Sequence, residues 1–257
     1  MHGDRMRTVF GKAVLVAAVG LTLFSGAARA GGYYLEVETG AAFNGYNDVR
    51  IPPDTGTEFS FTDDFETDPT AFIRLRIGLL DSEKHELSIF AAPLRFSARG
   101  TPAQDLVFDD EVFSGGTRLE GEYRFDSYRI TYLYGVYRSE GFSLDIGFTG
   151  KIRDAEISLS GGGKEAAYDN TGFVPLFAFG LSRSLGRNVR LLAEGDALAS
   201  PGGQGRAEDI FLGMAYARGE SLELRAGYRF LEGGADVDEV YSFALIHYLS
   251  LGIRLKL

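Results

Sequence analysis

The sequence predicts an all-β protein that forms a closed, antiparallel, up-and-down β-barrel spanning a membrane. Apolar residues alternate with polar or small ones through most of the chain, and helical periodicity is nearly absent. No run of about 18 apolar residues, which a transmembrane helix needs, follows residue 31. A spanning sheet must have no free edge, because each unpaired backbone group costs several kcal/mol in lipid. These observations favour closure into a barrel.

The first 30 residues predict a cleaved secretory signal peptide. Three basic residues open the chain, residues 13–24 are apolar or small, and residues 25–30 end in an Ala-x-Ala pattern. The apolar stretch is too short to cross a hydrocarbon core of about 30 Å as a helix. A retained N-terminal anchor is the alternative. We expect residues 31–257 to form one barrel domain.

The composition excludes several classes of function. The chain has no cysteine, which rules out disulfides, thiolate metal sites, cysteine nucleophiles and a lipid-modified N-terminal cysteine. Without residues 1–30 it keeps 35 acidic against 22 basic residues and has no basic stripe. A nucleic-acid partner is therefore not expected.

We expect ten strands, joined by four short turns and five longer loops. The strands cover about residues 33–43, 70–80, 86–98, 117–138, 142–159, 172–182, 188–199, 207–217, 221–231 and 241–257. An even count is the rule for bacterial barrels, whose short turns lie on the side of the two termini. A barrel of eight strands with larger loops is the first alternative, and a soluble β-sandwich is the second.

The fourth strand carries a change in apolar parity. Its apolar residues are odd-numbered through Phe125 and even-numbered from Tyr128 onward. A β-bulge inserts one residue and shifts every later side chain to the other face. We therefore predict a bulge near Asp126–Ser127.

Charged residues alternate with Leu, Ile and Phe on the strands, which predicts a charged lumen inside an apolar outer wall. Because closure places the last strand beside the first, the glutamates of the first strand are expected between basic residues of the second and last strands. A plug of ion pairs is the favoured interpretation, and a narrow polar pathway is the alternative. The expected lumen residues are Glu36, Glu38, Arg74, Arg76, Arg129, Asp145, Lys151, Arg153, Glu194, Asp196, Arg225, Arg229, Arg254 and Lys256.

The last strand carries the most specific motif in the chain. It reads polar-x-Gly-x-x-apolar-x-apolar and ends in Leu where Phe is usual; the motif residues are Ser250, Gly252, Leu255 and Leu257. This pattern, together with segments 123–129 and 231–240, resembles bacterial outer-membrane β-barrels of a family with no assigned activity. The resemblance implies a location in the Gram-negative outer membrane. It also implies contact with membrane lipids and lipopolysaccharide, and assembly by the barrel-assembly machinery.

Two enzymatic classes of barrel each share one feature with the chain. The strand count resembles that of the omptin proteases, whose His–Asp and Asp–Asp pairs face each other near the extracellular mouth. Here His2 belongs to the signal peptide, His85 lies in a turn, and His247 is expected to point outward. An outward His resembles the lipid A deacylases, but Ser250 is expected on the opposite face of that strand. Catalysis is therefore not favoured.

The expected outer loops are acidic, above all residues 44–69, which hold seven acidic residues against one arginine. Their spacing matches no calcium-binding loop, so a weak Ca²⁺ or Mg²⁺ site is the most they predict, and no cofactor is expected. We expect an integral barrel with a structural or interaction role. A narrow pore for small polar solutes and a lipid- or envelope-modifying hydrolase are the alternatives.

Overall fold

The computed structural model describes residues 32–257 except 82–83, 200–204 and 238–239. The predicted signal peptide, residues 1–30, lies outside the described residues. Among the described residues, no helix is long and apolar enough to cross a membrane.

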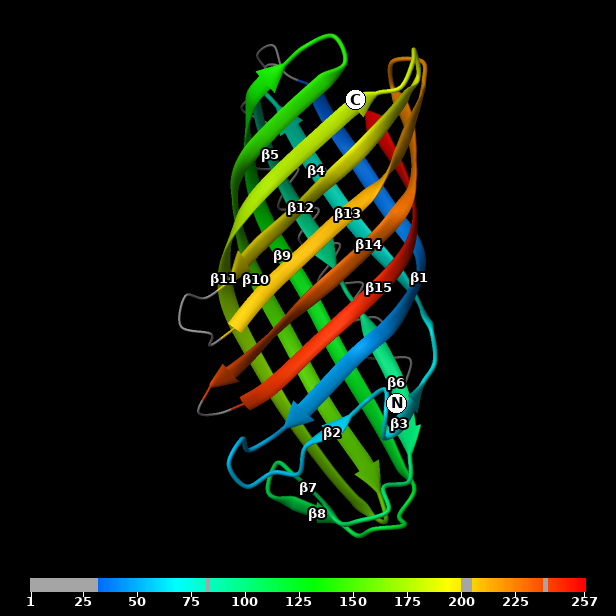
Figure 1. Ribbon diagram of the computed structural model, residues 1–257, viewed down its shortest axis with the longest axis vertical. Coiled ribbons are helices and arrows are strands. Elements are labelled where there is room, and N and C mark those ends of the chain that lie inside the picture. Colours follow the sequence, from blue (N-terminus) through cyan, green and yellow to red (C-terminus); the bar gives the residue numbers. More distant parts are fainter. Residues whose placement is uncertain (1–31, 82–83, 200–204, 238–239) are drawn as a thin grey trace.

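Ten antiparallel strands close into one barrel, which confirms the predicted fold class and strand count (Figure 1). Each strand pairs with its neighbour in sequence, and β1 pairs with β15 to close the ring. The barrel strands are β1 (Gly32–Arg50), β4 (Thr70–Leu80), β5 (His85–Ala92), β9 (Leu119–Arg138), β10 (Phe142–Gly161), β11 (Lys164–Ser184), β12 (Val189–Ala199), β13 (Gly205–Arg218), β14 (Leu222–Val237) and β15 (Val240–Lys256).

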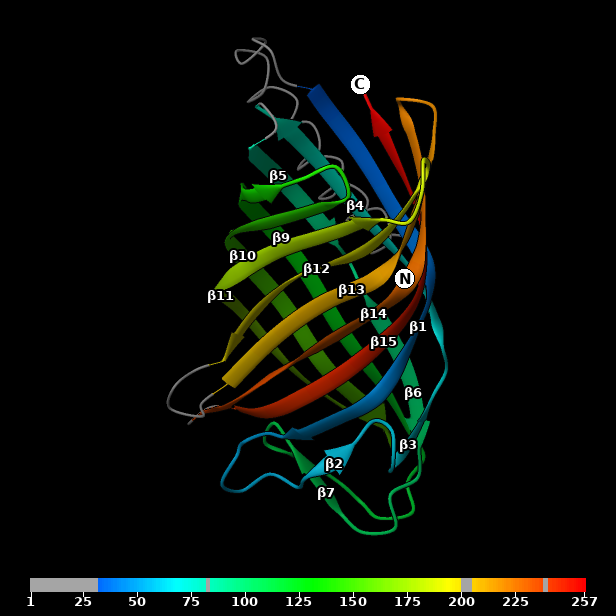
Figure 2. The ribbon, with the colours of Figure 1, turned by 45° about the horizontal axis from the view of Figure 1, so that its top comes forward.

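The two ends of the barrel differ in their connections. Short turns follow β4, β9, β11 and β13, at the same end as the start of β1 and the end of β15. Long connections follow β1 and β5 at the other end. Outer-membrane barrels have short periplasmic turns and longer extracellular loops. The end with the C-terminus, which comes forward in Figure 2, is therefore the periplasmic end.

Two long connections fold into a structured cap at the extracellular end. They contain the short strands β2 (Phe59–Ser60), β3 (Phe65–Thr67), β6 (Arg95–Gly100), β7 (Leu106–Phe108) and β8 (Glu111–Phe113). β2 pairs with β1, β6 pairs with both β3 and β9, and β7 and β8 form a hairpin. We call β2, β3, β7 and β8 with their linking residues the extracellular cap; in Figure 1 it lies at the lower end of the barrel.

Two predicted boundaries are wrong. The third strand is not continuous over residues 86–98, because it is interrupted at Pro93–Leu94 and divides into β5 and β6, which pair with β9 in one register. Proline has no N–H to donate to a strand ladder. The predicted long loop at residues 160–171 is also wrong. β10 and β11 run on as a hairpin to Gly162–Gly163, whose positive φ angles of 60° and 82° suit a two-residue turn.

The predicted bulge near Asp126–Ser127 is wrong. The register between β9 and β10 is unbroken from Tyr134↔Ile146 to Glu120↔Ser160, and its irregularity lies near the periplasmic end, between Leu144 and Asp145. Odd-numbered residues of β9 face inward on both sides of Asp126. The apolar parity changes because the surroundings of the strand change, while its geometry does not.

The outer wall changes polarity at one level on three neighbouring strands. Tyr128, Ile152 and Phe173 are paired across β9, β10 and β11, and they are the last outward apolar residues before the polar row Asp126, Asp154 and Thr171. This row marks the extracellular edge of the apolar belt, because charged residues are costly against hydrocarbon.

The inner wall changes in the opposite sense. Toward the periplasm it carries buried charged residues, whereas toward the cap it carries buried Leu, Ile, Phe and Tyr. Beyond the membrane the barrel therefore has the polarity of a soluble protein, with an apolar core and a polar surface.

Candidate functional site

The lumen is crossed near its middle by a neutral group of six charged side chains, which we call the central ion cluster. Its three acids and three arginines are contributed by six strands and are all buried. The members are Glu38, Arg74, Arg129, Asp196, Asp209 and Arg229. Equal numbers of opposite charges compensate the loss of hydration that burial imposes on each one.

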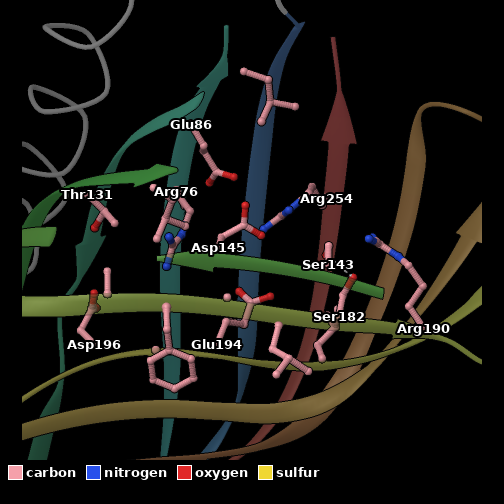
Figure 3. Close-up of a pocket in the computed structure, with 18 of the residues that line it drawn as sticks. Arg76, Glu86, Thr131, Ser143, Asp145, Ser182, Arg190, Glu194, Asp196 and Arg254 are labelled. Atoms are coloured by element: carbon pink, nitrogen blue, oxygen red, sulfur yellow. Dashed lines mark hydrogen bonds between the residues drawn. The ribbon is translucent and has the colours of Figure 1, made fainter. Parts of the chain in front are cut away.

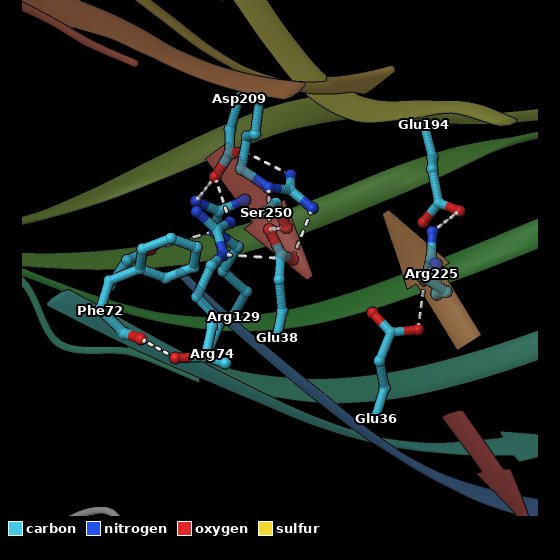
Figure 4. Close-up of polar contacts among 12 residues, drawn as sticks. Glu36, Glu38, Phe72, Arg74, Arg129, Glu194, Asp209, Arg225 and Ser250 are labelled. Carbon is cyan, nitrogen blue, oxygen red and sulfur yellow. Dashed lines mark hydrogen bonds and ion pairs between the residues drawn. The ribbon is translucent and has the colours of Figure 1, made fainter. Parts of the chain in front are cut away.

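Asp209 of β13 is the hub of the central ion cluster (Figure 4). Its carboxylate accepts hydrogen bonds from Arg74 at 2.6 Å, Arg129 at 2.5 Å and Arg229 at 2.7 Å. Arg229 also donates two hydrogen bonds of 2.8 Å to Glu38. This bidentate geometry fixes the orientation of the guanidinium plane relative to the carboxylate plane. The hub thus joins strands from opposite sides of the barrel.

Polar and aromatic side chains complete the central ion cluster. Ser250 Oγ donates to Glu38 Oε1 at 2.7 Å, and Thr149 Oγ1 donates to Asp196. The guanidinium groups of Arg74 and Arg129 lie 4.8 and 4.9 Å from the Phe90 ring centroid. Such contacts stabilise cations that are withdrawn from water.

A second neutral group, the periplasmic ion cluster, lies closer to the termini. It contains Glu36, Glu194, Arg225 and Arg254. Arg225 binds both glutamates, as Figure 4 shows, and Arg254 Nε donates to Glu36 at 2.6 Å. Arg254 also lies 4.4 Å from the Tyr34 ring centroid.

A polar vestibule of about 240 Å³ occupies the periplasmic part of the lumen. Arg76, Glu86, Asp145 and Glu194 line its sides, as Figure 3 shows, and Arg129 and Asp196 of the central ion cluster also line it. The vestibule therefore gives periplasmic solvent access as far as the central ion cluster.

An aromatic core closes the lumen on the extracellular side of the central ion cluster. Phe59 of the cap packs against Phe61, Phe65 and Phe108, with ring centroids 5.5 to 5.9 Å apart. Barrel residues that include Leu119, Phe96 and Ile157 complete this buried cluster. Along the barrel axis the described lumen thus passes from ion pairs to close-packed rings, and a separate cavity lies to one side in the wall.

Several expected lumen residues lie outside both ion clusters. Asp145 pairs with Arg138 at the periplasmic rim. Arg76 lines the vestibule with its guanidinium 5.2 Å from the Phe90 ring centroid. Lys256 is exposed at the rim, and Lys151 and Arg153 line a separate cavity in the wall.

The hub residue Asp209 was not anticipated from the sequence. It follows Glu208, and two adjacent acids leave open which of them points inward. The signal was available in its own strand, because Phe211 and Ala215 share the parity of Asp209 while Leu212, Met214 and Tyr216 share that of Glu208.

The two histidines in the described residues lie on the outer face of the barrel, and the terminal motif has residues on both faces. His247 lies on the outer face of β15, where its Nδ1 is 2.5 Å from the Tyr228 hydroxyl. Ser250 lies on the opposite, inner face, and His85 Nδ1 is 2.8 Å from the Tyr132 hydroxyl in the periplasmic half. Of the motif residues, Gly252 also faces inward, whereas Leu255 and Leu257 are exposed on the outside.

The acidic outer segments are partly structured. β1 extends to Arg50, and Glu232 lies on β14, where it binds Arg206. Asp109 lies in the β7–β8 turn; partial burial and the neighbouring Asp110 and Asp169 raise the pKa of its carboxyl. Within the described part of the chain, no group of three or more His, Asp or Glu residues is arranged to hold a metal ion.

Comparison with solved structures identifies the fold. The outer membrane protease OmpT of Escherichia coli superposes with a TM-score of 0.57 at 7% sequence identity, covering 88% of this chain and 97% of that one. The fold is that of a Gram-negative outer-membrane β-barrel. Its apolar belt around a charged lumen places the chain in the outer membrane.

Other outer-membrane barrels match with lower scores. The translocator domain of the autotransporter NalP from Neisseria meningitidis gives a TM-score of 0.44 at 13% identity, covering 96% of this chain and 98% of that one. Ail of Yersinia pestis gives 0.40 at 11% identity, covering 88% and 99%. No family model and no curated protein matches the sequence.

Proposed function

We propose that this protein is a sealed outer-membrane barrel with a structural or interaction role, exerted through its extracellular cap. One observation carries the proposal: two different seals lie in series along the lumen. The central ion cluster supplies the first and the aromatic core of the cap supplies the second. A solute moving along the barrel axis would have to cross a set of satisfied ion pairs and then a packed apolar core.

The vestibule supports the same proposal. It ends at Arg129 and Asp196, whose opposite charges leave no strong field of one sign to select an ion. The alternative of a narrow pore requires both seals to open together. A polar entrance on the periplasmic side alone does not provide a route.

Conductance in a planar bilayer tests the seal. We expect no discrete conductance steps from refolded protein whose folding is shown by heat-dependent gel mobility. Arg74→Glu places a fourth acid in the central ion cluster, so it should lower the unfolding midpoint while the aromatic core keeps the barrel closed. A second variant combines Arg74→Glu with replacement of Phe59, Phe61, Phe65 and Phe108 by serine, which removes the rings of the aromatic core, and it should conduct.

Steps from the wild-type protein that change in size with Arg74→Glu would make it a pore with its constriction at the central ion cluster. A folded second variant that stays silent would show that the two seals are not the barrier, and would also contradict the proposal.

The partners are proposed on the same basis. The apolar belt is proposed to contact outer-membrane lipids and lipopolysaccharide, and weak Ca²⁺ or Mg²⁺ binding is proposed for the acidic extracellular segments.

The barrel-assembly machinery is proposed to recognise the motif from Ser250 to Leu257. Deletion of Leu257 tests this recognition: we expect reduced insertion into the outer membrane but unchanged refolding in detergent. Normal insertion in cells would exclude a role for that residue.

A further inference from the structure

A second cavity, of about 370 Å³, lies in the barrel wall between β11 and the strands β12–β14. β11 pairs with β12 from Phe177 to Ser184, whereas residues 164–176 are paired with β10 alone among the described residues. β12 ends at Ala199 and β13 begins at Gly205, short of the extracellular ends of β9–β11 in Figure 1. Among the described residues, no strand of the wall lies beside the outer part of β11 on the side away from β10.

This cavity, which we call the lateral site, passes through the wall. Its lining includes Lys151 on the inner face of β10 and Phe173 on the outer face of β11, whose side chain is 70% exposed. Phe173 belongs to the row that ends the apolar belt. The opening therefore faces the lipid at the extracellular boundary of the hydrocarbon.

Most of the lateral site is apolar or small. Its walls include Phe125, Ile157, Val174, Leu198, Ala207 and Leu231. The volume lies at the low end of the range of about 300–1,000 Å³ that small-molecule sites occupy. This size suits one acyl chain and excludes a lipid with several chains.

Two cations at the inner end of the lateral site have no described acid within salt-bridge distance. Lys151 is 4% exposed, and its ammonium lies 4.9 Å from the Phe125 ring centroid. The acids that interact with it at longer range, Asp196 and Asp209, are already bound to arginines of the central ion cluster. Arg153 donates to the amide oxygen of Asn170, and its buried Nε has no partner among the described residues. Buried charges normally have partners, because an unpaired one is costly.

The acids that line the lateral site are already occupied. Glu156 accepts hydrogen bonds from Arg124, and Glu232 accepts them from Arg206 and Tyr46. Among the described residues that line the lateral site, no other acid is available to Lys151 and Arg153. Residues i and i+2 of a strand lie about 7 Å apart on one face, a distance that one carboxylate group can bridge with hydrogen bonds from both side chains.

We propose that the lateral site binds a single fatty acid, which enters from the outer leaflet with its carboxylate between Lys151 and Arg153. The acyl chain lies along Val174, Leu198 and Leu231 and leaves the wall beside Phe173. This inference goes beyond the sealed-barrel proposal and stands without it, because the lateral site opens to lipid.

Photocrosslinking tests the site directly. The full mature chain is placed in phosphatidylcholine nanodiscs with palmitate that carries a diazirine on its chain, and labelled peptides are mapped by mass spectrometry. We expect labelling concentrated on residues 168–174 and 205–207, and competition by unlabelled palmitate but not by hexadecanol, which has the same chain and no charge.

Three variants sharpen the test. Lys151→Met keeps the side-chain volume and removes the charge, so labelling should fall about tenfold, the loss expected for one charge-assisted hydrogen bond. Its unfolding midpoint should stay equal or rise, because an unpaired buried cation is removed. Lys256→Met, at the periplasmic rim, removes the same charge elsewhere and should label normally. Ala207→Leu narrows the apolar part and should also reduce labelling.

Equal labelling around the whole apolar belt, or unchanged labelling of the folded Lys151→Met protein, would overturn the site. Competition by lysophosphatidic acid without competition by palmitate would overturn the assignment of a carboxylate ligand. Neither result bears on conductance, so the failure of this proposal and that of the sealed barrel are distinguishable.

Discussion

The membrane half of this barrel and its extracellular half have opposite polarity: the first has an apolar outer wall and a charged interior, and the second has a polar outer wall and an apolar interior. In the membrane half, Ile146 and Phe148 of β10 face outward and Thr149 and Lys151 are buried inside. In the extracellular half of the same strand, Glu156 faces outward and Leu159 is fully buried.

The comparison shows that polarity along a strand reports its surroundings as well as its register. Lipid outside the barrel requires an apolar outer wall and allows charged residues to be stored within. Water outside the barrel removes that requirement, and the hydrophobic effect then places the aromatic residues inside.

The largest expected effect comes from breaking the core of the membrane half. Asp209→Ala leaves three buried arginines without their shared carboxylate and should lower the free energy of unfolding by about 3–5 kcal/mol. Glu232→Gln breaks an outer pair with the exposed Arg206 and should cost about 1 kcal/mol or less. Urea unfolding in phospholipid vesicles measures both, and equal costs would contradict the contrast.

The core of the extracellular half is expected to fail locally. Phe61 is fully buried among the rings of the cap, so Phe61→Ala should destabilise that core by about 3–5 kcal/mol. Hydrogen exchange should speed up in β2, β3, β7 and β8 and stay slow in β12–β14. Uniformly faster exchange around the barrel would show that the two halves form one cooperative unit.

A charge placed on the outer wall sharpens the boundary between the halves. Phe148→Arg faces lipid and should cost about 2–4 kcal/mol, the range for arginine near the bilayer midplane. Ser158→Arg lies on the same face of the same strand beyond the polar row, and it should change stability by about 0.5 kcal/mol or less. Refolding midpoints in vesicles compare the two.

The smallest expected effect is in the β7–β8 turn, where Asp109 and Asp110 both have positive φ angles, of 47° and 64°. Asn-Gly is the preferred pair for such a turn, so Asp109→Asn with Asp110→Gly should stabilise the cap by about 0.5 kcal/mol or less at neutral pH.

The pH dependence follows from the raised pKa of Asp109. The folded state holds that proton more tightly than the unfolded chain does. The contribution of protonated Asp109 to the free energy of unfolding is therefore complete below about pH 4, the ordinary pKa of aspartate. This contribution is lost as pH rises through the raised pKa. The increase in cap stability caused by the double variant should therefore become smaller below about pH 4. An increase that does not change with pH would show that the stabilisation comes from turn geometry alone.

Alternation and the terminal motif were enough to predict the class, the strand count and the inward side of most charged residues. Glu36 and Arg254, for example, follow from parity and closure alone. The side-chain pairing could not be predicted, because Arg225 of β14 reaches Glu36 of β1 past the intervening strand β15, whereas parity and register place only adjacent strands side by side.

The wrong prediction of a bulge near Asp126–Ser127 also arose where the sequence allows more than one structure. A change of parity in β9 has two physical explanations, an inserted residue or a change of medium, and sequence alternation does not distinguish them. The lateral site could not be predicted from the sequence either. It depends on how far β11 extends past β12, and the prediction placed residues 160–171 in a loop.

A spin-label scan along β10 tests the inversion of polarity most directly. Because the chain has no cysteine, single cysteines at residues 146, 148, 152, 154, 156 and 158 can each carry one nitroxide without background labelling. In vesicles, we predict high oxygen accessibility for labels at 146, 148 and 152, and high accessibility to a water-soluble nickel complex at 154, 156 and 158. A label at 154 or 156 that is exposed to oxygen, or buried from both reagents, would contradict an unbroken register with its boundary at Ile152.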